Sequence, residues 1–205
     1  EILRCLVGSE MCIRDSDMDL TNRLLSMLCC LFILYLIGMM DDLIGVRYRS
    51  KFVGQILCGI LLPISGLYFD NLHGLFGIYT LPYYLGIPFT VFLIVYILNA
   101  INLIDGIDGL ASGLSIISFL AFSCMFIRLQ WWMYSFISLA AFSVLLPFFY
   151  YNVYGKIHRG RKIFMGDTGS LTIGMLLAMM VIRLSMSDPV KESLFPCLLY
   201  TSPSP

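Results

Sequence analysis

The chain has 205 residues, of which 59% are hydrophobic and 13% are charged, and its formal net charge is zero. Its mean hydropathy of +0.87 is far above that of soluble domains, in which about 25% of residues are charged. This composition excludes an ordinary soluble protein and predicts an all-α, polytopic integral membrane protein. The neutral net charge gives no reason to expect nucleic acid as a partner.

The two ends of the chain differ in character from the rest. Residues 1–16 and 197–205 follow no membrane periodicity and resemble translated adapter or library sequence, so we expect both to be non-native. Residues 17–196 are expected to form a transmembrane catalytic domain that is a fragment of a longer protein. Four cysteines lie in apolar runs, where we expect them to pack as small hydrophobes: Cys29, Cys30, Cys58 and Cys124.

Six apolar runs approach the roughly 20 residues that a membrane-spanning helix needs. They lie at about 24–40, 52–69, 85–104, 109–128, 131–150 and 169–186. Prolines in or near these runs do not argue against spanning, because membrane helices tolerate kinks. We therefore expect about six transmembrane helices, with a small hairpin in the turn-rich segment 70–84.

The charge of the connecting segments predicts the topology. Segments 41–51 and 151–168 are basic, whereas 70–84 contains no Lys or Arg. The positive-inside rule then places the basic segments in the cytoplasm. Following the crossings brings carboxylates from three separate connections to that same side: Asp41, Asp42, Asp105, Asp108 and Asp167. We expect a functional site where they meet.

The stretch Asn99–Ala111 ends an apolar run with polar residues spaced three apart, which would place them on one face of a continuing helix. They are Asn99, Asn102, Asp105 and Asp108. An Asp near the centre of a membrane helix costs about 2.5 to 3.5 kcal/mol, so such residues are expected to serve a function. The glycines that follow both acids would let the backbone approach a ligand. We interpret the stretch as part of a site for a cation and phosphates.

Two shorter motifs complete the predicted site. Asp41 and Asp42 end the first apolar run, where the helix dipole disfavours acids; being adjacent, they point in different directions, so one can face a metal or phosphate and the other a lysine. A solvated helix end remains the alternative for this pair. Gly166-Asp-Thr-Gly-Ser170 opens the last run with a carboxylate, hydroxyls and backbone amides, which suits a phosphate and cation cradle.

Other interpretations of these motifs fit less well. A calcium loop beginning at Asp105 would need Glu at its twelfth position, which is Ile116. An aspartic protease needs two Asp-Thr-Gly loops, and the one at Asp167 precedes a membrane run. A cation transporter stays open as a remote alternative, although it predicts carboxylates spread through the bilayer rather than gathered at one face. For Asn152, a helix-end amide and a site residue both remain open.

In order and spacing, the motifs resemble the polyprenyl-phosphate N-acetylhexosamine-1-phosphate transferases, which are glycosyltransferase family 4. The resemblance covers nearly all of residues 20–186. It rests on Met40-Asp-Asp42, Arg49-Ser-Lys-Phe-Val-Gly-Gln55, the stretch Asn99–Ala111, Asn152 and Phe164-Met-Gly-Asp-Thr-Gly-Ser-Leu171. The family's early helices and its His-rich loop have no counterpart, so we expect this chain to be the middle of such an enzyme.

The resemblance implies a Mg²⁺-dependent phosphotransferase, in which a lipid phosphate attacks the β-phosphorus of a UDP-sugar and UMP leaves. It implies catalytic roles for Asp41, Asp42, Asp105 and Asp108. It implies substrate binding by Lys51, Asn99, Asn102 and Asn152. It implies metal binding by Asp167 together with Asn102.

The resemblance also implies partners and a location. We expect undecaprenyl phosphate and a UDP-sugar as substrates, with a homodimer as one assembly that the family resemblance allows. The site would face the cytoplasm from the bacterial plasma membrane and start a cell-envelope polysaccharide. N-acetylglucosamine 1-phosphate is the expected transferred group, because the basic segment before Gly166 is long. Phospho-MurNAc-pentapeptide transfer is the alternative.

Overall fold

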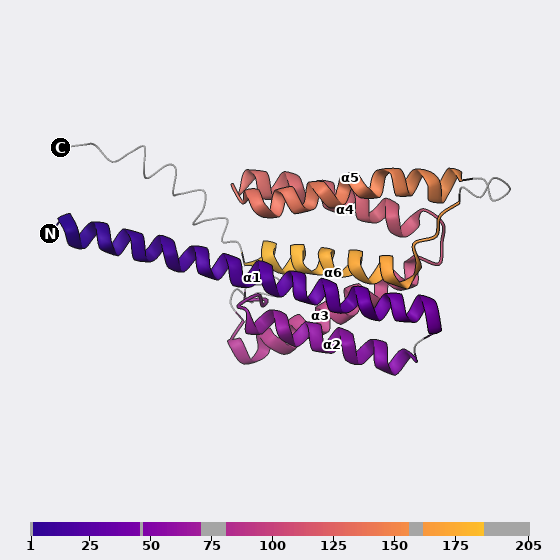
Figure 1. Ribbon diagram of the computed structural model, residues 1–205, viewed down its shortest axis with the longest axis horizontal. Coiled ribbons are helices and arrows are strands. Elements are labelled where there is room, and N and C mark those ends of the chain that lie inside the picture. Colours follow the sequence, from indigo (N-terminus) through magenta and orange to yellow (C-terminus); the bar gives the residue numbers. More distant parts are fainter. Residues whose placement is uncertain (1, 46, 71–80, 156–161, 187–205) are drawn as a thin grey trace.

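The structure is a computed structural model that describes residues 2–45, 47–70, 81–155 and 162–186, with side chains from residue 20 onward. Within these residues the chain forms six α-helices and no strand, as expected for an all-α membrane protein (Figure 1). The helices are α1 (Ile2–Ile44), α2 (Tyr48–Ile64), α3 (Tyr83–Ile104), α4 (Leu110–Arg128), α5 (Trp132–Tyr154) and α6 (Gly166–Ser185).

The last helix, α6, lies at the centre of the bundle. It packs against α1 and α3 and more lightly against α4, while α2 packs against α1 and α3, and α4 pairs with α5 (Figure 1). Of the most apolar 18-residue stretch of α6, 56% is buried, compared with 17% to 33% of the corresponding stretches in the other four candidate spans. The neighbouring helices therefore fix the position of α6, and with it the residues of its first turn.

Five of the six helices are long and apolar enough to cross a membrane, namely α1 from Leu20 onward and α3 to α6. The sixth expected span, at about 52–69, is α2, which ends at Ile64 and has 17 residues. At about 1.5 Å per residue it is about 26 Å long, slightly short of the roughly 30 Å hydrocarbon core. Ser65 caps its C-terminus, and Gly66, with a φ of 82°, comes next and turns the chain out of the helix.

The α3–α4 connection corrects one expectation from the sequence. Asn99 and Asn102 lie in α3, but the helix ends at Ile104, and Asp105 to Gly109 form a turn. Gly109 has a φ of 77°, which breaks the helical path at low steric cost. Asp105 and Asp108 therefore do not continue one helical face; they stand on a turn beyond it.

The described residues test the smaller expectations only in part. The hairpin expected in segment 70–84 lies mostly outside the described residues, although Leu81 N–H donates to the Asp70 carbonyl at 2.8 Å. The non-native end expected at 197–205 also lies outside them, and α1 runs from Ile2 without a break at residue 17. Of the four cysteines expected to pack, Cys30 and Cys58 are buried, whereas Cys29 and Cys124 are exposed.

A close contact between α1 and α6 depends on Gly38. A Cβ atom on Gly38 would lie 2.5 Å from Thr168 Cα and 2.9 Å from Thr168 N, so no larger residue fits without separating the helices. Since both partners are backbone, neither can move aside as a flexible side chain would. Gly38 thus brings the end of α1 against the start of α6.

Replacing Gly38 tests this packing. We expect Gly38→Ala to destabilise the protein by about 1 to 3 kcal/mol, because overpacking forces α1 away from α6, despite the better helix propensity of alanine. Thermal unfolding of the detergent-purified protein measures the effect, with Gly106→Ala as control, since a Cβ there would meet only the Leu103 carbonyl oxygen, at 3.6 Å. A midpoint as high in Gly38→Ala as in the control contradicts the packing.

Candidate functional site

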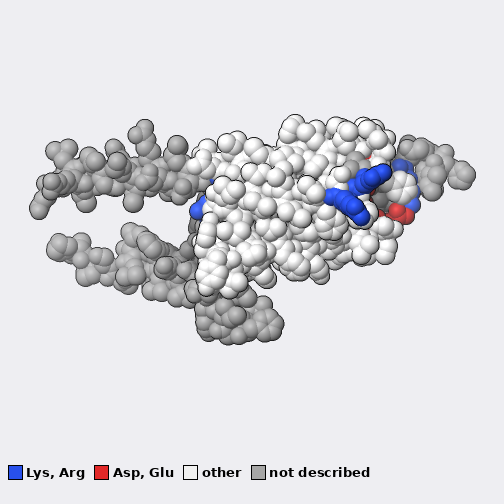
Figure 2. Space-filling view, turned by 90° about the horizontal axis from the view of Figure 1, so that it is seen from below, with Lys and Arg blue, Asp and Glu red and all other residues white. Residues whose placement is uncertain are grey.

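The candidate site lies at one end of the bundle, where α1 and α3 end and α2 and α6 begin. On the face shown in Figure 2, charged side chains gather at this end, and a small basic spot lies at the opposite end. The flank between the two ends is uncharged. An uncharged flank with a charged end is what a membrane-spanning bundle requires, because charge is costly in hydrocarbon.

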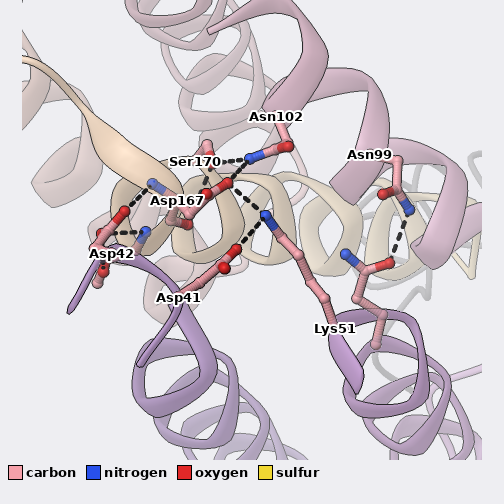
Figure 3. Close-up of polar contacts among 9 residues, drawn as sticks. Asp41, Asp42, Lys51, Asn99, Asn102, Asp167 and Ser170 are labelled. Carbon is pink, nitrogen blue, oxygen red and sulfur yellow. Dashed lines mark hydrogen bonds and ion pairs between the residues drawn. The ribbon is translucent and has the colours of Figure 1, made fainter. Parts of the chain in front are cut away.

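Asp167, in the first turn of α6, is the centre of the site. Its Oδ1 accepts hydrogen bonds from Lys51 Nζ of α2 and from Asn102 Nδ2 of α3 (Figure 3). Lys51 also contacts Asp41 of α1 at 3.1 Å, and Asn102 also donates to Ser170 Oγ at 2.8 Å. Four helices thus contribute to one polar cluster.

The ammonium of Lys51 balances two carboxylates in a partly dry setting. The exposed fractions of the side chains are 13% for Lys51, 12% for Asp41 and 34% for Asp167. Charges this far removed from water interact more strongly than a surface pair, and removal of one partner leaves the other uncompensated. Lys51 therefore holds Asp41 and Asp167 close together.

The adjacent acids Asp41 and Asp42 point in different directions, as expected. Whereas Asp41 faces Lys51, the carboxylate of Asp42 accepts hydrogen bonds from the backbone N–H of Asp167 at 2.9 Å and of Thr168 at 3.0 Å. The Thr168 hydroxyl donates to it as well, at 2.5 Å. The amides at the start of α6 that suggested a phosphate cradle are thus bound to the protein's own carboxylate.

Asn99 lies one helical turn deeper than Asn102. Its Nδ2 donates to Gln55 Oε1 at 2.8 Å and to the Val95 carbonyl at 2.7 Å (Figure 3). Gln55 is fully buried, and its Nε2 has no hydrogen-bond partner among the described residues. The structure therefore places Asn99 in a second polar layer with Gln55, which is four residues after Lys51 on the same face of α2.

Asn152, near the end of α5, is 5% exposed and joins two loops. Its Oδ1 accepts from Gly109 N–H at 2.6 Å, and its Nδ2 donates to the Ile163 carbonyl at 2.8 Å. Asp108 forms an ion pair with Lys162 at 2.5 Å. Asn152 and Asp108 thus tie the α3–α4 turn to the segment before α6, outside the Asp167 cluster.

Asp105 joins the site through its charge. Burial raises the pKa of its carboxyl above the ordinary value of 3.8, and the negative charges of Asp167, Asp108 and Asp42 raise it further. These carboxylates therefore lie close enough to repel one another. Such an excess of negative charge is what a bound cation would relieve.

The residues present suit a magnesium ion by their chemistry. Among the described residues, no three Asp, Glu, His or Cys side chains form a ready-made metal cluster. Magnesium, however, usually takes one or two carboxylates and completes its shell with water and substrate phosphates. Asp167 and the amide oxygen of Asn102 are oxygen donors of the kind it prefers, and the repulsion at Asp105 favours a cation beside them.

Sequence reasoning missed Gln55 and misassigned two hydroxyls that shape the site. Gln55 lies inside a quoted motif but received no role, whereas Thr168 and Ser170 were expected to offer their hydroxyls to a phosphate and a cation and instead bind Asp42 and Asn102. Gln55 carried the clearest signal, because an amide buried in an apolar helix needs a partner. The roles of Thr168 and Ser170 depend on which atoms α1 and α3 bring to them, and no spacing along the chain reveals that.

Comparison with known proteins gives one family match. The family described as glycosyl transferase family 4 matches residues 24–185. The phospho-N-acetylmuramoyl-pentapeptide-transferase of Enterococcus faecalis is 39% identical over 170 residues, covering 75% of this chain and 50% of the relative. That of Staphylococcus carnosus is 35% identical over 165 residues, covering 73% and 50%.

A relative with a different substrate in its name also matches. The undecaprenyl-phosphate alpha-N-acetylglucosaminyl 1-phosphate transferase of Yersinia pestis is 30% identical over 151 residues, covering 72% of this chain and 40% of the relative. The chain spans about half the length of the curated relatives it matches.

The raised pKa of Asp105 predicts a pH-dependent stability. At pH values below 3.8 the carboxyl is mostly protonated in both the folded and the unfolded state. As the pH rises towards the higher folded pKa, the unfolded state ionises first and stability falls. We expect Asp105→Asn to unfold at a higher temperature than the wild type at pH 7.5, and most of this difference to be lost at pH 3.5. Thermal midpoints at the two pH values measure this. An Asp105→Asn variant less stable than the wild type at pH 7.5 contradicts it.

Proposed function

Because this chain belongs to glycosyl transferase family 4, we propose that it transfers an N-acetylhexosamine 1-phosphate from a UDP-sugar to a polyprenyl phosphate and releases UMP. The observation that carries the proposal is the cluster of Lys51, Asn102 and Asp167, which three helices assemble at the end of an apolar bundle. At that position a lipid phosphate anchored in the bilayer and a soluble nucleotide can meet.

Lys51 supplies positive charge where the reaction gathers negative charge. Phosphoryl transfer depends mainly on positioning and on charge stabilisation, and an ammonium flanked by Asp41 and Asp167 is held in place for a phosphate oxygen. The Nδ2 group of Asn102 already donates to Asp167 and Ser170, so this nitrogen orients the carboxylate and only the amide oxygen is left for a ligand.

A proton acceptor is not strictly required. A phosphate monoester has its second pKa near about 6 and is largely dianionic at neutral pH. Asp41 is engaged with Lys51, which supports a role in positioning that lysine rather than in removing a proton. We propose Asp167 and the Asn102 oxygen as the magnesium site. When bound there, the cation would supply the charge neutralisation that helps the pyrophosphate bond break.

Two sugars remain candidates. The sequence favours N-acetylglucosamine, and the relative from Yersinia pestis carries that sugar in its name. The relatives from Enterococcus faecalis and Staphylococcus carnosus are more similar in identity and are named for the muramoyl-pentapeptide, which favours the second candidate. We retain N-acetylglucosamine 1-phosphate as the first proposal and test both.

We also propose that the site faces the cytoplasm of a bacterial cell. Arg47 lies in the α1–α2 connection at the site end and Arg49 in the first turn of α2, and the segment before α6 adds a basic cluster between residues 156 and 162. Positive charge of this kind stays on the cytoplasmic side, where nucleotide-linked sugars are made and where the product would begin an envelope polysaccharide.

The test uses bacterial membranes that contain the protein expressed from its natural gene. We expect labelled sugar from UDP-N-acetylglucosamine to enter extractable lipid only with magnesium, with UMP released. Asp167→Asn should abolish transfer, because it removes the central carboxylate, whereas Asp70→Asn at the opposite end should not. Label from UDP-MurNAc-pentapeptide alone assigns the second candidate. No label from either donor, or normal transfer by Asp167→Asn, contradicts the proposal in its activity or in its metal site.

A further inference from the structure

We propose that Asp42 is a positioning residue, which caps the N-terminus of α6 from the end of α1 and thereby fixes where Asp167 stands. This inference rests on the proposed function, because Asp167 is taken there as the central carboxylate. It separates the roles of two adjacent acids that sequence analysis treated as a catalytic pair.

The start of α6 lacks a cap of its own. The first amides of a helix have no intrahelical acceptor and need one from elsewhere. Met165 precedes α6 and offers no side-chain hydrogen bond to it, whereas a local cap would be Ser, Thr, Asp or Asn. The Asp42 carboxylate fills this gap, with its Oδ1 on Asp167 N–H and its Oδ2 on Thr168 N–H.

The charge of Asp42 suits this position. A helix N-terminus carries a partial positive charge, so a carboxylate there is favourable, although acidic residues are unfavourable at a helix C-terminus such as that of α1. Asp42 thus belongs to the disfavoured end of α1, but its carboxylate lies at the favoured end of α6. The contact also explains why an acid stands at the end of α1, and this explanation requires no ligand.

Two glycines make room for the contact. A Cβ on Gly166, where φ is 66°, would lie 3.0 Å from Asp42 Oδ2. Gly38 precedes Asp42 by four residues on the same face of α1 and allows the backbone of Thr168 to approach. The acid, both glycines and the threonine hydroxyl therefore form one unit, which we call the α1–α6 clasp: Gly38, Asp42, Gly166 and Thr168.

The clasp acts on the site through the residue that it holds. Asp42 binds the backbone of Asp167, and the side chain of Asp167 receives Lys51 and Asn102. A shift of the first turn of α6 would move the Asp167 carboxylate relative to both donors. By contrast, both carboxylate oxygens of Asp42 accept hydrogen bonds from the first turn of α6, and Asp41 is the member of the pair that contacts Lys51.

Substitutions distinguish a cap from a catalytic carboxylate. Asn is also a good helix cap, but it cannot take or give a proton as a carboxylate does. We therefore expect a graded series at position 42. Because misplacement of a catalytic group by about 1 Å can cost 10²-fold, kcat should fall about 100-fold in Asp42→Ala and about 10-fold in Asp42→Asn. The KM for the nucleotide should stay within about twofold, and the thermal midpoint should fall in the same order.

The partner hydroxyl supplies an independent check. Thr168→Val removes one of the bonds to Asp42 and keeps the shape of the side chain, whereas Thr168→Ser keeps the hydroxyl and serves as the matched control. Thr168→Val should lower the thermal midpoint in the wild type and have little further effect in Asp42→Ala, since residues that share a bond are coupled.

The thermal cycle needs no substrate, so it judges the clasp even if neither UDP-sugar is used by the wild-type protein. If the wild-type protein uses neither UDP-sugar, the proposed function is overturned, and the unfolding measurements alone decide whether the clasp exists. Equal inactivity of Asp42→Asn and Asp42→Ala, with an unchanged thermal midpoint in both, overturns the clasp and assigns Asp42 to the chemistry. An equal effect of Thr168→Val with and without Asp42 also overturns it.

Discussion

The bond between the Asp42 carboxylate and the first turn of α6 is the interaction on which the rest of the site depends. It joins the end of the first described helix to the start of the last, more than a hundred residues later in the chain. Because α6 packs at the centre of the bundle, fixing its first turn also fixes Asp167. The ammonium of Lys51 can then balance the negative charges of both Asp41 and Asp167.

The polar groups are arranged in layers from the charged end of the bundle inward. Asp108 and Lys162 pair on the outer turn, the Asp167 cluster lies beneath, and Gln55 with Asn99 lies deeper still. Each layer answers the same constraint, because a polar group removed from water must find a partner. The deepest layer leaves one Gln55 donor without a partner among the described residues, so this layer is the least satisfied of the three.

Much of the site was predictable from the sequence because it depends on charge and membrane topology. Apolar runs and basic connections sufficed to bring Asp41, Lys51 and Asp167 to one end. The turn at Asp105 was harder, because whether Gly109 breaks a helix depends on how α4 meets α5. The direction of Asp42 was beyond reach, since it depends on a close approach of two backbones rather than on any spacing along the chain.

The most direct measurement is the hydrogen-exchange rate of the Asp167 and Thr168 amides, observed by NMR of selectively labelled protein in detergent micelles. These amides stand at a helix N-terminus, where exchange is normally fast because no intrahelical acceptor exists. If Asp42 holds them, they should exchange as slowly as amides inside the last helix. Exchange as fast as that of unprotected amides would contradict the account, because Asp167 would then stand on an uncapped turn.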